Sequence, residues 1–186
     1  PSIYNFGYIG STETTLMTYN SSGAIRYWDI RSSALKLSTD TESNLQGIAV
    51  LQTESKTTMF GYRNDTIYLI NRQTGAVLDQ RTVTGLRNVS VDEDRGEIDI
   101  ITQGTAGDFL HEYRVQNERF VPRTNGMNAL SNNAVPVIID RSIKPVKVLR
   151  RNASTFLLSE SGKLLVNEGG RYKTIIPSHL WRPNSL

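Results

Sequence analysis

Few side chains in this sequence could do chemistry. It contains no cysteine and only two histidines, His111 and His179, which lie far apart along the chain. A catalytic triad or a metal site needs further ligands or a nucleophile at convergent positions, and the sequence around neither histidine offers them. The lack of cysteine excludes a disulfide framework and a thiolate metal site. We therefore expect no catalytic residue, no metal and no cofactor, and we expect that the protein is not an enzyme.

An acidic run is the main candidate for cation binding. Asp92, Glu93 and Asp94 are followed closely by Glu97 and Asp99. The run lacks the alternating acidic residues, the central glycine and the distal glutamate that build a calcium loop. We interpret it as an acidic turn between two strands.

Basic side chains are concentrated toward the end of the sequence. Residues 1–118 contain 10 basic and 15 acidic residues, a net charge of −5, whereas residues 119–186 contain 11 basic and 3 acidic residues, a net charge of +8. A basic surface attracts acidic proteins, nucleic acid or anionic lipid, although the same charges could simply keep a face solvated. The predicted partner-binding residues are Arg141, Lys144, Lys147, Arg150, Arg151, Arg171, Lys173 and Trp181.

The elements that must position these side chains are short β-strands in a repeated order. Four candidate hairpin strands follow turns that contain Gly, Asn or Asp, and they begin at Ala24, Thr66, Asp108 and Lys163, at intervals of 42, 42 and 55 residues. A further strand lies before each hairpin and another after it. Four strands repeated about every 40 to 45 residues are typical of propeller blades.

The repeat predicts one all-β domain over residues 1–186, built from about four antiparallel four-stranded units. We expect these units at residues 3–40, 44–83, 86–124 and 144–177, with an irregular insertion at 121–140 that accounts for the longer last interval. The predicted fold is a β-propeller or part of one. A β-sandwich or barrel remains the alternative, because regularly spaced short strands describe these folds as well.

The first unit contains a Trp-Asp dipeptide, Trp28 and Asp29, at the end of its third strand, and Ile70 and Asn71 occupy the matching positions of the second unit. In this respect the chain resembles a degenerate WD-repeat propeller, from Ile3 to about Pro177. The segment "YLINRQTGAVLDQ" is equally similar to a blade of the quinoprotein-like propellers. Either resemblance implies a blade, and the WD-repeat one implies that other proteins are its partners.

The function that we expect from these features is a non-catalytic protein-protein interaction or scaffold module of a larger assembly. The alternatives are nucleic-acid binding through basic residues 141–173, a viral or phage structural β protein, and a glycan-binding or hydrolytic β protein, which would need paired carboxylates in a cleft. We expect no signal peptide and no membrane span, because the aliphatic runs are too short. With no cysteine, an intracellular location in the cytoplasm or nucleus is the expectation. The oligomeric state is left open.

Overall fold

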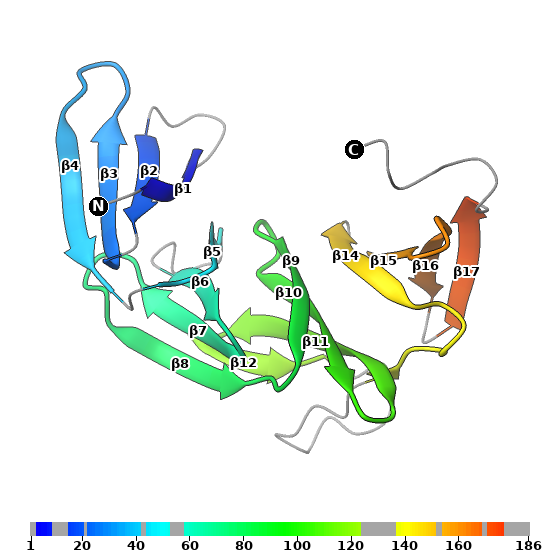
Figure 1. Ribbon diagram of the computed structural model, residues 1–186. Helices are drawn as coiled ribbons and strands as arrows, with labels where there is room; N and C mark the ends of the chain where they lie inside the picture. Colours follow the sequence, from blue (N-terminus) through cyan, green and yellow to red (C-terminus); the bar gives the residue numbers. More distant parts are fainter. Residues whose placement is uncertain are drawn as a thin grey trace. The chain divides into compact units, whose positions relative to one another are not determined.

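The computed structural model (Figure 1) describes residues 3–8, 15–20, 22–41, 44–52, 58–123, 137–151, 154–168 and 171–176. Within these ranges the regular secondary structure is entirely β, with strands β1 to β17. The chain divides into two compact units, Pro1–Thr82 and Val83–Leu186, and each unit is described by itself.

The first unit contains two antiparallel sheets, and in each sheet the strands follow one another in chain order. This order is an up-and-down meander, in which every strand pairs with the strand before it and the strand after it. The first sheet consists of β1 (Ile3–Tyr8), β2 (Thr15–Asn20), β3 (Ala24–Asp29) and β4 (Leu35–Asp40). The second sheet consists of β5 (Gly47–Val50), β6 (Thr58–Arg63), β7 (Thr66–Asn71) and β8 (Val77–Thr82).

Residues that tolerate a positive φ close the tight turns. Asn64, with φ of 49°, forms a two-residue turn with Asp65 between β6 and β7. Gly23, with φ of 89°, precedes β3. Such turns match the right-handed twist of the strands that they join, so these residues set the register of both hairpins.

Alternating apolar residues form the core between the two sheets of the first unit. One face of β2 and β3 contributes Met17, Tyr19, Ile25 and Tyr27. These side chains pack in one cluster with residues of the second sheet and its leading segment, Leu45, Val50, Met59, Tyr68 and Ile70. The hydroxyl of Tyr19 accepts a hydrogen bond of 2.8 Å from the backbone N–H of Leu45, so the cluster also satisfies a buried donor.

The second unit also contains two meanders. One consists of β9 (Leu86–Asp92), β10 (Glu97–Gly104), β11 (Gly107–Gln116) and β12 (Arg119–Pro122), and the short β13 (Val137–Ile138) pairs with β11. The other consists of β14 (Pro145–Arg151), β15 (Ser154–Ser159), β16 (Leu164–Glu168) and β17 (Arg171–Ile176). The two sheets share a core of Ile101, Leu110, Ile139, Ile143, Val148, Leu157 and Leu165, against which Tyr172 packs.

These sheets confirm the prediction of an all-β fold made of antiparallel four-stranded repeats. The four meanders span residues 3–40, 47–82, 86–122 and 145–176. Of the predicted insertion at 121–140, residues 124–136 lie outside the described residues, while its ends belong to β12 and β13. The prediction of a single domain over 1–186 stays a prediction.

Candidate partner-binding surface

The predicted basic residues fall into separate groups. Lys147, Arg151 and Lys173 are exposed and share one face of the sheet β14–β17, as their strand pairings show. Arg141 and Arg171 are among the residues that line a pocket, together with Leu165 and Tyr172 of that sheet. Trp181 and His179 lie outside the described residues.

Lys144 precedes β14 and points into solvent. Its backbone has a φ of 42°, and its ammonium lies 3.8 Å from the carboxylate of Glu160. Both side chains are exposed, by 72% and 67%, so this ion pair contributes little to stability.

Arg150 does not belong to any surface. Its side chain is only 2% exposed, and its Nε and Nη2 donate to Oε2 of Glu97 at 2.9 and 2.7 Å. Nη1 donates to the hydroxyl of Thr155 at 2.8 Å, and the backbone N–H donates to Oγ of Ser90 at 2.7 Å. These bonds join β14 to β9 and β10, so we assign Arg150 to the interior of the second unit, in place of the surface role expected from the sequence.

Three carboxylates and two guanidinium groups meet around Arg150. Asp99 is fully buried and accepts a hydrogen bond of 2.6 Å from Thr155, while Glu112 lies 3.8 Å from Nη1 of Arg150. The second cation, Arg123, lies 3.6 Å from Glu97 and 3.9 Å from both Asp99 and Glu112. We call this group of six residues, with Thr155 included, the charge network.

The surroundings of Asp99 in the charge network perturb its pKa. Burial raises the pKa of Asp99 to about 6, and this outweighs the hydrogen bond from Thr155 and the attraction of Arg150, both of which lower it. Burial, together with the carboxylates of Glu112 and Asp99, also raises the pKa of Tyr172. Asp99 therefore takes up a proton near neutral pH.

The interpretation of the acidic run as a turn holds for only part of it. Glu97 and Asp99 lie in β10, both buried, on the face that meets Arg150. Glu97, Asp99 and Ile101 are spaced two residues apart, and alternate residues share one face of a strand. This spacing could have predicted that the two carboxylates lie on the same face as the apolar Ile101. Among the described residues, no group of three or more His, Asp or Glu side chains has the geometry to hold a metal ion.

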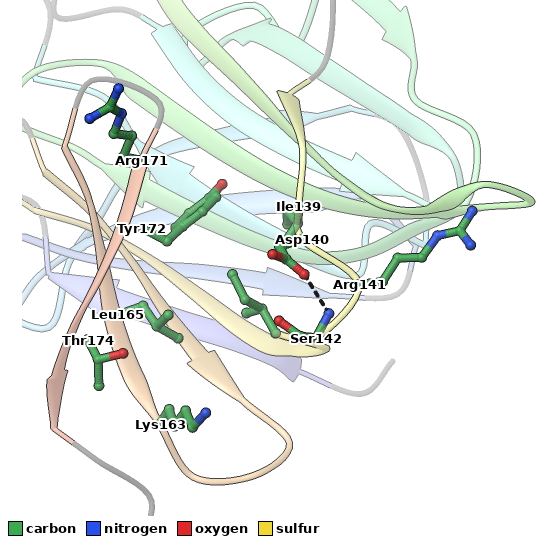
Figure 2. Close-up of a pocket in the computed structure, with 10 residues that line it drawn as sticks. Ile139, Asp140, Arg141, Ser142, Lys163, Leu165, Arg171, Tyr172 and Thr174 are labelled. Carbon is green, nitrogen blue, oxygen red and sulfur yellow. Dashed lines mark hydrogen bonds between the residues drawn. The ribbon is translucent and has the colours of Figure 1, made fainter.

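A pocket of about 540 Å³ lies between the 139–143 segment and the sheet β14–β17. Its wall contains Leu165, Tyr172 and Thr174 from the sheet, and its border contains three cations, Arg141, Lys163 and Arg171. Figure 2 shows these cations on different sides of the pocket, with the two guanidinium groups pointing away from each other. The arrangement suits several separate negative charges better than one compact anion.

Asp140 supplies the carboxylate among the described residues that line the pocket, and it is already engaged. Asp140 accepts a hydrogen bond of 2.8 Å from the backbone N–H of Ser142, drawn as a dashed line in Figure 2, and hydrogen bonding from Ser142 lowers the pKa of Asp140. Arg141 donates through Nε to the carbonyl of Ala106 at 3.1 Å. The 139–143 loop is thus held in place, and its cation stays at the border of the pocket. Lys163, Ser142 and Tyr172 were not predicted from the sequence, because β-sheet packing brings them together from distant segments.

His111 has a structural environment. Its Nε2 lies 2.9 Å from the hydroxyl of Thr102 on the neighbouring strand, and burial lowers its pKa.

The end of the third strand repeats in the first two sheets. Oδ1 of Asp29 accepts from the backbone N–H groups of Arg31 and Ser32, and Oδ1 of Asn71 accepts from those of Gln73 and Thr74 at the same distances, 2.9 and 3.1 Å. The proposed match of Asp29 with Asn71 is therefore confirmed by geometry. Asp and Asn can both form this side-chain turn, so the second sheet can have Asn71 where the first sheet has Asp29.

Comparison with known proteins supports the repeated-sheet architecture. Residues 1–84 match a family model described as an N-terminal beta-propeller domain, which is less than half of the 186 residues. A sequence comparison with curated proteins found no match. Among the described residues, no helix is long and apolar enough to cross a membrane.

Solved structures resemble the chain over most of its length. The Neurospora crassa Pan2 WD40 domain matches with a TM-score of 0.61 at 9% identity, covering 92% of this chain and 52% of that one. A chain in the crystal structure of a mitotic checkpoint complex matches with a TM-score of 0.50 at 13% identity, covering 92% and 48%. The chain thus spans about half the length of these structures. At such low identity the likeness shows the fold alone, and that fold is the β-propeller.

Proposed function

We propose that this chain is a non-catalytic protein-interaction module, and that its pocket beside β14–β17 binds an acidic segment of a partner protein. The observation that carries the proposal is the border of Arg141, Lys163 and Arg171 around a pocket of about 540 Å³. All three side chains are exposed, whereas Asp140, the carboxylate among the described lining residues, is hydrogen bonded to its own loop. Exposed cations of this kind attract and orient an acidic partner.

The spread of the three cations favours an extended acidic peptide. They lie on different sides of the pocket (Figure 2), so one phosphate or carboxylate would not reach all of them. An extended peptide with several acidic side chains would reach all three cations, and its backbone could lie along the half-exposed surface of Tyr172 and the exposed Thr174. The structurally similar chain from the crystal structure of a mitotic checkpoint complex belongs to a complex, which agrees with a role in protein interaction.

Fluorescence anisotropy with a labelled acidic peptide of about eight residues, roughly 27 Å when extended, tests the proposal. Each single change, Arg141→Gln, Lys163→Gln or Arg171→Gln, should weaken binding about two- to fivefold, the effect of one partly exposed charge. The triple variant should weaken binding more than about tenfold. An isosteric glutamine peptide should bind weakly to the unmodified protein.

The matched control is a triple variant with Lys147→Gln, Arg151→Gln and Lys173→Gln. It loses the same three charges, but from side chains that do not line the pocket. Equal losses in the two triple variants would refute the pocket as the site, because only net charge would matter. Tighter binding of a single-stranded RNA of equal charge, with a steep salt dependence, would favour the nucleic-acid alternative.

A further inference from the structure

The strand β17 forms one edge of the sheet β14–β17. It stands at the end of the strand order and, among the described strands, pairs with β16 alone. Figure 1 shows it in orange-red at the border of its sheet. Backbone N–H and C=O groups of a strand point alternately to its two sides, so those of every second residue of β17 point away from β16. An edge of this kind is a template for pairing with a strand of another molecule.

The edge of β17 differs in charge from that of β8, which holds the same place in the second sheet. In β8, Asp79 and Arg81 lie 3.7 Å apart and balance each other. In contrast, β17 contains Arg171 and Lys173 and no acidic residue. Like charges on two paired strands are destabilising, whereas opposite charges stabilise the pair. The edge of β17 therefore disfavours pairing with a copy of itself and favours an acidic strand.

The pocket bordered by the three cations lies along this edge. Its sheet wall comes from the two outermost strands, with Leu165 from β16 and Arg171, Tyr172 and Thr174 from β17. Figure 2 shows these three residues of β17 in succession along the strand. A strand added beyond β17 would extend the wall, and every second one of its side chains would lie on the pocket side of the sheet.

A β-bulge limits the regular part of the edge. The register between β16 and β17 shifts so that Ile175 is an extra residue without a partner in the pairing. Because a bulge bends its strand and interrupts the ladder, we expect regular pairing beyond β17 only along Arg171–Thr174, a length of roughly 13 Å. This part of the strand is accessible: Tyr172 is half-exposed, and the other three residues are exposed. The accessible part of the edge thus coincides with the wall of the pocket.

From this coincidence we propose that the acidic segment of the partner binds by adding a strand to β17, with its backbone paired to Arg171–Thr174 and alternate acidic side chains on the pocket side. The inference rests on the proposed function and specifies the partner as an extended acidic strand. In strand addition, backbone hydrogen bonds supply affinity and alternate side chains supply specificity. Arg141, across the pocket from β17, and Arg171 are the cations that the acidic side chains then meet.

Fluorescence anisotropy with three labelled octapeptides tests strand addition. Each consists of four Glu-Thr repeats; one is unmodified, one is N-methylated at its glutamates and one at its threonines. All three carry the same charge, so electrostatics does not distinguish them. In a strand the N–H groups of alternate residues point to the same side, so each set of methyl groups blocks one edge of the peptide. One methylated peptide should bind at least about tenfold more weakly than the other.

Hydrogen exchange of the protein gives a second readout. With the unmodified peptide at about twenty times its dissociation constant, alternate amides of residues 171–174 should exchange at least about tenfold more slowly. The amides of β8 are the control, because this strand is also the edge of a four-stranded sheet but has balanced charges. Their exchange should change by less than about twofold.

The outcomes separate this inference from the proposed function. If the unmodified peptide binds and the pocket variants weaken its binding, but the two methylated peptides bind equally, strand addition is wrong and the pocket remains the site. Unchanged exchange of residues 171–174 with bound peptide would overturn strand addition as well. If the unmodified peptide does not bind, the proposed function is refuted, and strand addition with it.

Discussion

Replacing the buried Arg150 tests whether the charge network holds the two sheets of the second unit together. Arg150→Met keeps an apolar stem but removes a guanidinium that lies 2.7 Å from Glu97 and is 2% exposed. Of the two guanidinium groups of the charge network, only that of Arg123 then remains, and it lies at least 3.6 Å from Glu97, Asp99 and Glu112. Removing one partner of a buried ion pair costs about 3–5 kcal/mol, or roughly 10²- to 10⁴-fold in the unfolding equilibrium.

Native-state hydrogen exchange measures this loss where it arises. Amides of β10, β14 and β15 should exchange faster in Arg150→Met by about the same factor, up to the limit set by the stability of a domain, which is typically 5–15 kcal/mol. Arg151→Met is the matched control, because it makes the same substitution at the next residue, which is exposed on the other face of β14. The control should change exchange by less than about threefold.

The pH dependence gives a second readout. In the folded protein the pKa of Asp99 is about 6, and in the unfolded chain it is near 3.9. Between these values the folded state holds a proton that the unfolded state lacks, so this contribution to stability is present at low pH and is lost as the pH rises through about 6. Arg150→Met should therefore lose less stability at about pH 5 than at about pH 7.5, because a neutral Asp99 needs no cation. Equal exchange in the two methionine variants, or a loss that does not depend on pH, would refute the reasoning.

Three further predictions concern single positions. Asp99→Asn should flatten the fall in stability between about pH 4 and 6, a contribution of about 3 kcal/mol for a pKa raised from 3.8 to about 6, and urea unfolding across this range checks it. Gly75→Ala should lower the stability of the first unit by at least about 1–3 kcal/mol, because φ is +75° and a Cβ would overlap the carbonyl oxygen of Asp40. Thermal unfolding of Gly75→Ala and Gly75→Asn separates these two causes, because Asn tolerates this φ but also carries a Cβ. An equal loss of stability in the two variants would indicate the overlap with Asp40 as the cause. Tyr19→Phe should cost about 1–3 kcal/mol in urea unfolding, because the buried N–H of Leu45 loses its acceptor, and an unchanged midpoint would contradict this.

Local chemistry determined the repeated strands of this protein. Asn64 and Gly23 sit at turns whose positive φ they tolerate, and successive side chains of the strands between such turns point to opposite faces of the sheet. The side-chain turn after the third strand follows from Asp29 and Asn71, since either type can accept the two backbone hydrogen bonds. These are short-range effects, so they could be predicted without knowing what each sheet packs against.

Tertiary structure alone decided which face of each strand is interior. Arg150 and Arg151 are adjacent and of one type, and strand alternation requires only that they face opposite sides. Arg150 is buried because Glu97 and Asp99, more than fifty residues earlier, lie on the facing sheet and supply its hydrogen-bond and charge partners, whereas Arg151 meets solvent. The pocket bordered by Arg141, Lys163 and Arg171 has the same origin. A charge is buried only where distant partners compensate its desolvation, and the packing of one sheet on another decides where those partners are.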